Sequence, residues 1–88
     1  MSLWDRVPHR HLIDRLLYRP DRCWLLHELE WIAATTHMPN GTDQPDGATR
    51  WERTHDHPAT MSTTLVRVVL GTDGRTIVTA IPIRTWKS

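Results

Sequence analysis

The feature that most constrains the fold is a pair of β-branched and apolar runs in the C-terminal half, joined by a glycine-containing turn. The runs are STTLVRVVL at 62–70 and RTIVTAIPI at 75–83, with GTDG between them. Such residues favour extended strands, and an Asp-Gly pair favours a tight hairpin turn. We therefore expect an antiparallel hairpin with one face against the core. That face should carry Val66, Val68, Leu70, Ile77, Thr79 and Ile81.

Residues 50–57, RWERTHDH, also alternate and predict a third strand. One face of this strand carries Trp51, Arg53, His55 and His57. A three-residue turn at 58–60 would place the histidines beside Arg67, whereas a four-residue turn would place them under the helices. Because burying an arginine and two histidines without partners costs on the order of several kcal/mol, we expect the Arg67 side.

A different pattern, with apolar residues three and four apart, occupies the N-terminal part of the chain. It predicts one helix over residues 8–18 and another over 21–36, separated by Arg19-Pro20-Asp21. The two helices should form an antiparallel hairpin. The expected apolar stripes consist of Leu12, Ile13, Leu16 and Leu17 in the first helix and of Leu25, Leu29, Ile32 and Thr36 in the second.

These elements predict an α+β fold. Residues 1–88 should form a single domain, in which the helix hairpin packs on one face of a three-stranded antiparallel sheet. A short fourth strand at 83–86 is an additional option. Residues 37–49, HMPNGTDQPDGAT, contain two turn-forming sequences and no apolar periodicity, so we expect a loop there.

Composition limits the setting of the protein. Cys23 is the only cysteine and therefore cannot form an internal disulfide. No apolar stretch approaches the roughly 20 residues that span a bilayer, and the N-terminus lacks the order of a signal peptide. We expect a cytoplasmic protein without a membrane partner.

The net charge of +1 conceals an uneven distribution. Residues 1–22 sum to +2, residues 23–47 to −4 and residues 48–88 to +3. A basic, acidic, basic order can fold to expose one basic face, although the total is far below that of a general nucleic-acid binder.

The His-x-His pair at 55 and 57 raises the question of a metal site. Two histidines on one strand face can supply two ligands, with His37, Asp56 or Glu52 as completions. A site usually needs three protein ligands, and no third ligand has diagnostic spacing. We therefore predict no metal and no other cofactor.

Phosphate chemistry needs no metal. An imidazole can move a proton to or from a ribose or leaving oxygen, and arginine can stabilise charge that develops on phosphate. The candidate catalytic residues are therefore Arg53, His55, His57 and Arg67, with Trp51 as a platform on which a base can stack.

The stretch LVRVVLGTDGRTIVTAIP, residues 65–82, resembles the final hairpin of small bacterial ribonuclease toxins of the RelE, colicin and barnase-like superfamily. In those proteins a pair of helices precedes an arginine-bearing strand, a glycine-containing turn and a closing strand that ends in a V-T-x-x-P phrase. The resemblance implies a metal-independent endoribonuclease or an RNA-binding relative. It implies Arg67 as the phosphate-binding arginine, with Thr79 or Arg84 as a helper, although the face assignment above turns Thr79 away from Arg67.

A non-catalytic alternative remains open. The acidic middle segment contains Trp24, Glu28 and Trp31, and tryptophan is frequent at interface hot spots. These three residues could bind a protein, as in an inhibitor or accessory protein of a phage or mobile element. The expected partners are thus RNA, a protein such as an antitoxin or an inhibited target, or a second copy of the chain.

Overall fold

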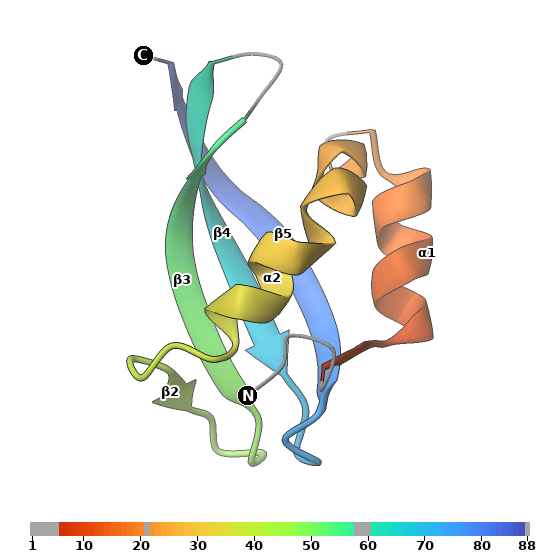
Figure 1. Ribbon diagram of the computed structural model, residues 1–88, viewed down its shortest axis with the longest axis vertical. Helices are drawn as coiled ribbons and strands as arrows, with labels where there is room; N and C mark the ends of the chain where they lie inside the picture. The colour runs from red at the N-terminus through yellow and green to blue at the C-terminus, as the bar shows by residue number, and fades with distance from the viewer. Residues whose placement is uncertain (1–5, 21, 58–60, 88) are drawn as a thin grey trace.

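Two helical segments cover one face of a twisted sheet in the computed structural model (Figure 1). The structure describes residues 6–20, 22–57 and 61–87. The α+β class and the position of the helices on one face of the sheet are as expected. The elements are β1 (Val7–Pro8), α1 (Arg10–Tyr18), the 3-10 helix η2 (Cys23–Glu28), α2 (Leu29–Thr35), β2 (Thr42–Asp43), β3 (Thr49–Asp56), β4 (Ser62–Leu70) and β5 (Thr76–Lys87).

The sheet has five strands in the order β1-β5-β4-β3-β2. The predicted antiparallel strands form its centre as β3, β4 and β5, while β1 pairs in parallel with β5. The expected number of strands was therefore wrong, because the two-residue strands β1 and β2 carry no alternation of their own and exist by pairing with a neighbour. The optional strand at 83–86 is the continuation of β5.

The helices differ from prediction in one respect. α1 ends at Tyr18 because Arg19 is extended (φ −108°, ψ 110°), as residues before a proline tend to be. The second predicted helix is divided at Glu28, whose backbone (φ −117°, ψ 21°) leaves the helical region, so that a 3-10 turn precedes α2. The division directs η2 toward the end of the sheet where β4 begins and β5 ends (Figure 1). Trp24 of η2 contributes there to the sites described below.

The core lies between the helices and the sheet. Of the predicted helix stripes, Leu12, Leu16, Leu25 and Ile32 are buried in this core. Leu17 is 52% exposed, so its predicted place in the core was wrong. Trp51 is buried, and its indole nitrogen donates a hydrogen bond to the Met38 carbonyl (3.0 Å). The buried cluster consists of Leu12, Leu16, Leu25, Ile32, Ala33, Trp51, Val66, Val68, Leu70, Ile77 and Ala80.

The β4–β5 hairpin contains two register shifts that alter which side chains share a face. Leu70 pairs with Ile77 as expected, but a shift beside Leu70 pairs Val69 with Thr79 and Val68 with Ala80. The extra residue of a bulge reverses the parity of the residues that follow it, here as far as the second shift, between Leu65 and Val66, which restores it. The prediction that Thr79 and Ile81 face the core was therefore wrong, and Ala80 takes that place.

The β3–β4 hairpin has the longer of the two turns considered. His57 N–H donates to the Ser62 carbonyl (2.7 Å), so residues 58–61 separate the paired positions. His55 consequently pairs with Thr64, whereas Arg67 pairs with Glu52. The histidines lie on the helix side of the sheet, and the prediction that they share a face with Arg67 was wrong.

Arg6 ties the start of the described chain to two distant segments. Its Nε donates to Thr36 Oγ1 (2.8 Å) and one Nη donates to the Gly74 carbonyl (2.9 Å). The other Nη donates to the Thr36 carbonyl (3.3 Å). The guanidinium therefore joins the end of α2 to the β4–β5 turn.

No helix in the described part of the chain is long and apolar enough to cross a membrane.

Candidate functional site

The residues that the sequence marked as catalytic on β3 interleave with two tryptophans from the helices. Arg53 Cζ lies 5.4 Å from the centre of the Trp31 ring, and the His55 ring lies 4.3 Å from the same ring. Trp24 stacks on His55 at 6.0 Å with the planes 7° apart, and contacts His57 at 4.5 Å. We call this series the Trp–His stack.

The stack follows from strand geometry. Alternate residues of a strand are roughly 6.6 Å apart on one face, which leaves room for about one ring between them. Trp24 and Trp31 are seven residues apart and reach into these spaces from η2 and α2. The two tryptophan rings on the helices are therefore spaced to fit between alternate side chains of β3.

Glu28 supplies the charge partner within the stack. Its Oε2 lies 3.2 Å from Nε2 of His55, close enough for an ion pair although not aligned as a hydrogen bond. Both side chains are about one-fifth exposed (20% and 22%). The Trp24 and Trp31 rings and the Glu28 carboxylate therefore offset the expected free-energy cost of burying His55 under the helices. The prediction chose the wrong face because it counted no such partners.

The Trp–His stack changes the roles open to its members. Both tryptophans contact the His55 ring, so this imidazole packs as part of the interface between β3 and the helices. Trp24, Glu28 and Trp31 are half-buried at the interface with β3, and their binding of a partner stays a prediction. The buried Trp51 is not available as a platform for a base.

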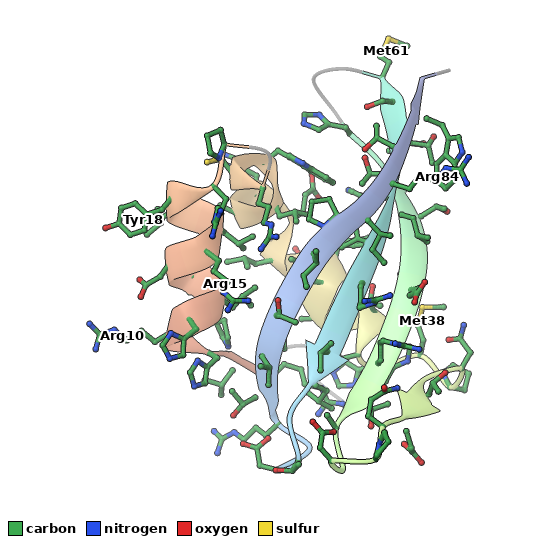
Figure 2. The ribbon with its side chains drawn as sticks, turned by 180° about the vertical axis from the view of Figure 1, so that it is seen from behind. Arg10, Arg15, Tyr18, Met38, Met61 and Arg84 are labelled. Atoms are coloured by element: carbon green, nitrogen blue, oxygen red, sulfur yellow. The ribbon has the colours of Figure 1, made fainter. Side chains whose placement is uncertain are left out.

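The opposite face of the sheet has no helix on it in the described part of the chain (Figures 1 and 2). Figure 2 looks onto this side, with the strands in front of α2. We call it the open face. By strand pairing it carries Arg50, Glu52 and Thr54 of β3, Leu65, Arg67 and Val69 of β4, and Thr79, Ile81, Arg84 and Trp86 of β5.

Arg67 lies at the middle of the open face. One Nη of Arg67 donates to Glu52 Oε1 (3.2 Å), and Arg50 Nε lies 3.9 Å from the same oxygen. One carboxylate thus serves two guanidinium groups. The positive charge of the group exceeds its negative charge by one.

Two polar atoms near this group lack a hydrogen-bond partner among the described residues. They are Arg67 Nε and Thr79 Oγ1, and both are covered from solvent. Because Val69 pairs with Thr79 and Arg67 pairs with Ile81, the two side chains are diagonal neighbours on adjacent strands. Covered polar atoms without partners are uncommon, and these two lie beside the Arg67–Glu52 ion pair.

A second arginine lies further along the open face. Arg84 Cζ lies 5.1 Å from the centre of the Trp86 ring, which is 38% exposed. The open face therefore holds Arg67, Thr79 and Arg84 together, the three positions that the family resemblance indicated. Trp86 was not among the predicted site residues, although its position two residues after Arg84 was a usable signal.

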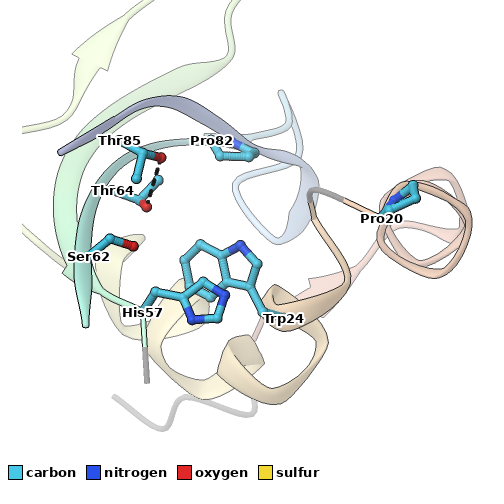
Figure 3. A pocket seen from close by; sticks show the side chains of 7 residues that line it. All are labelled: Pro20, Trp24, His57, Ser62, Thr64, Pro82 and Thr85. Carbon is cyan, nitrogen blue, oxygen red and sulfur yellow. Dashed lines mark hydrogen bonds between the residues drawn. The ribbon is translucent and has the colours of Figure 1, made fainter. Parts of the chain in front are cut away.

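A hollow of about 300 Å³ lies on the helix side, near the far ends of β4 and β5. Ser62 and Thr64 are buried there, and the hydroxyls of Thr64 and Thr85 are 3.1 Å apart (Figure 3). His57 borders this space rather than the open face. The residues that line the hollow are Pro20, Trp24, His57, Ser62, Thr64, Pro82 and Thr85.

Metal ligands do not gather within residues 6–20, 22–57 and 61–87, where no three His, Cys, Asp or Glu side chains form a group that could hold an ion.

The fold and its surfaces define a small α+β domain with two helices on one side of a mixed sheet and arginines on the other. Comparison of the chain with protein-family models, with curated proteins and with solved structures gives no match.

Proposed function

We propose that this domain binds single-stranded RNA through the open face. The observation that carries the proposal is the presence of Arg67, Thr79 and Arg84 on one uncovered sheet face, with Trp86 beneath Arg84. Single-stranded nucleic acid is bound by combining cations for the backbone with aromatic rings for the bases. The open face offers both.

Arg67 provides the central phosphate contact in this proposal. Its ion pair with Glu52 is partly exposed, with both side chains at 36%. Such pairs contribute about 1 kcal/mol or less, so a phosphate can replace or share the carboxylate at small cost. A guanidinium offers two parallel donors to phosphate oxygens, and the Thr79 hydroxyl is a neighbouring donor.

Arg84 and Trp86 provide the second contact. The guanidinium lies over the indole at a cation–π distance, which holds it on the sheet surface. A phosphate at Arg84 leaves the adjacent base near the partly exposed Trp86 ring, on which the base stacks when the guanidinium turns from the ring to the phosphate. Stacking on an aromatic side chain contributes about 1–3 kcal/mol per base and tolerates any sequence.

Cleavage of RNA at the open face would need a group that moves a proton, in addition to the arginines that bind phosphate. The imidazoles of His55 and His57 lie on the helix side, so a transesterification at Arg67 cannot use them in this arrangement. Glu52 is the carboxylate in contact with Arg67 and is the group placed to accept a proton there. The proposal is therefore RNA binding, with ribonuclease activity decided by assay.

The test is titration of a fluorescent single-stranded RNA with wild type and with the Arg67→Ala/Arg84→Ala double variant. Loss of two phosphate contacts should weaken binding by roughly tenfold or more. Arg10→Ala is the matched control, because Arg10 is an exposed cation that points away from the sheet on α1 (Figure 2). It should change the dissociation constant by less than about twofold.

Two results would overturn the proposal: no RNA binding at low salt, or equal losses in the double variant and in Arg10→Ala. Incubation of the same RNA with wild type in EDTA measures cleavage separately. The alternative protein-binding function predicts a defined complex or homodimer by light scattering that is insensitive to Arg67→Ala.

A further inference from the structure

We propose that the hollow between η2 and the ends of β4 and β5 holds one nucleobase of an RNA strand that crosses the edge of β5. The path of the strand rests on the proposed function, whereas the occupancy of the hollow by a base can be tested alone.

The lining consists mainly of uncharged side chains, and His57 is the one titratable group among its described residues. None of the described residues around the hollow is Asp, Glu, Lys or Arg. Figure 3 shows the hydroxyls of Thr64 and Thr85, which are 3.1 Å apart, along one side of the space. Such a surface matches the uncharged donors and acceptors at the rim of a base.

Size and shape agree with a single flat ring. A volume of about 300 Å³ is at the lower end of small-molecule sites, and accommodates a base more readily than a dinucleotide. Pro20 and Pro82 supply apolar surface at its margins. RNA-binding proteins commonly recognise an unstacked base by combining apolar or aromatic contact with hydrogen bonds to its edge.

The edge of β5 connects the hollow to the open face. β1 pairs with β5 only at Thr76 and Ile77, and among the described residues no other strand pairs with this edge. Successive residues of a strand point to opposite faces. Arg84 therefore lies on the open face while Thr85 lines the hollow. A strand held at Arg84 can cross this edge and insert its next base.

The experiment titrates wild-type protein with uridine and with adenosine, which contain a base but no phosphate. The measurement is the chemical-shift change of the backbone amides and of the Trp24 indole N–H. We expect saturable changes confined to the lining residues, with a dissociation constant on the order of 1 mM. The Arg67→Ala/Arg84→Ala variant should bind the nucleosides as wild type does, even though it loses RNA.

The Thr64→Val/Thr85→Val variant removes two hydroxyls and keeps the strand-favouring branched shape. It should bind nucleosides roughly tenfold more weakly. The single variant Thr85→Val, at an exposed residue, serves if the double variant does not fold. D-ribose is the control ligand and should leave these signals unchanged.

Absence of nucleoside binding, an unchanged affinity in the valine variants, or the same shifts with D-ribose would each overturn the proposal. If nucleosides bind in the hollow while RNA ignores Arg67 and Arg84, the base site stands and the open-face function fails. If RNA binding depends on those arginines but nucleosides do not bind, the open-face function stands and the base site in the hollow fails.

Discussion

Local partners decide the ionisation of Asp73 in the β4–β5 turn. Its carboxylate accepts hydrogen bonds from the Thr76 hydroxyl (2.6 Å), the Thr76 N–H (2.8 Å) and the Arg75 N–H (2.9 Å). These bonds favour the charged form, with the Thr76 hydroxyl as the largest cause, and lower the pKa of Asp73 from 3.8 to about 2. Asp73 therefore reports directly on the structure of the turn.

We predict that the carboxyl carbon of Asp73, followed by NMR, titrates near pH 2, and that Thr76→Val raises the midpoint toward 3.8. Because the folded pKa is lower than the unfolded pKa, the stabilisation is complete above about pH 4 and is lost as the pH falls through about 2. Thr72→Val, in the same turn, is the control and should leave the midpoint unchanged. A wild-type midpoint near 3.8 would contradict the turn geometry.

At the scale of elements, the Trp–His stack joins β3 to the helices. We predict that His55→Ala lowers the free energy of unfolding by about 2 kcal/mol, measured by urea denaturation with circular dichroism. The substitution removes a ring that contacts Trp24 and Trp31 and whose Nε2 lies 3.2 Å from the Glu28 carboxylate. RNA binding at the open face should be retained.

The control for this substitution is Thr54→Ala, on the same strand but exposed on the open face. It should cost at most about 1 kcal/mol, the range of strand propensity. Equal losses for the two variants would show that the stack does not stabilise the interface between β3 and the helices.

At the scale of the whole molecule, the distribution of charge matters more than the total of +1. Binding through Arg67 and Arg84 should give a slope of about −1.4 in a plot of log affinity against log salt concentration, from two contacts at about −0.7 each. The double alanine variant should reduce the slope toward zero. A steep slope that is unaffected by the substitutions would indicate binding through other cations.

Several features could be predicted from the sequence because their causes are local. Alternation placed the central strands, and apolar spacing placed Leu12, Leu16, Leu25 and Ile32 in the core. Strand pairing places Arg67, Arg84 and Thr79 on the open face, although alternation alone assigned Thr79 to the other face. The roles that the family resemblance implied for these residues stay predictions.

The wrong predictions of sheet face all arise from the register of strand pairing. One bulge beside Leu70 turned Thr79 and Ile81 to the open face, and one extra turn residue after His57 moved the histidines under the helices. A change of one residue exchanges the two faces of a strand, while the hydrophobic pattern of a polar strand is too weak to forbid it. Local sequence therefore left both choices open.

By itself, the sequence of this protein determined its helices, its central strands and most of its core, since these depend on the periodicity of neighbouring residues. Only the tertiary structure decided which face of the sheet His55 and His57 occupy. Trp24, Trp31 and Glu28, far from these histidines in the chain, provide the partners that make burial of His55 favourable. The free energy that selects a face comes from contacts between distant segments, and these exist only in the folded chain.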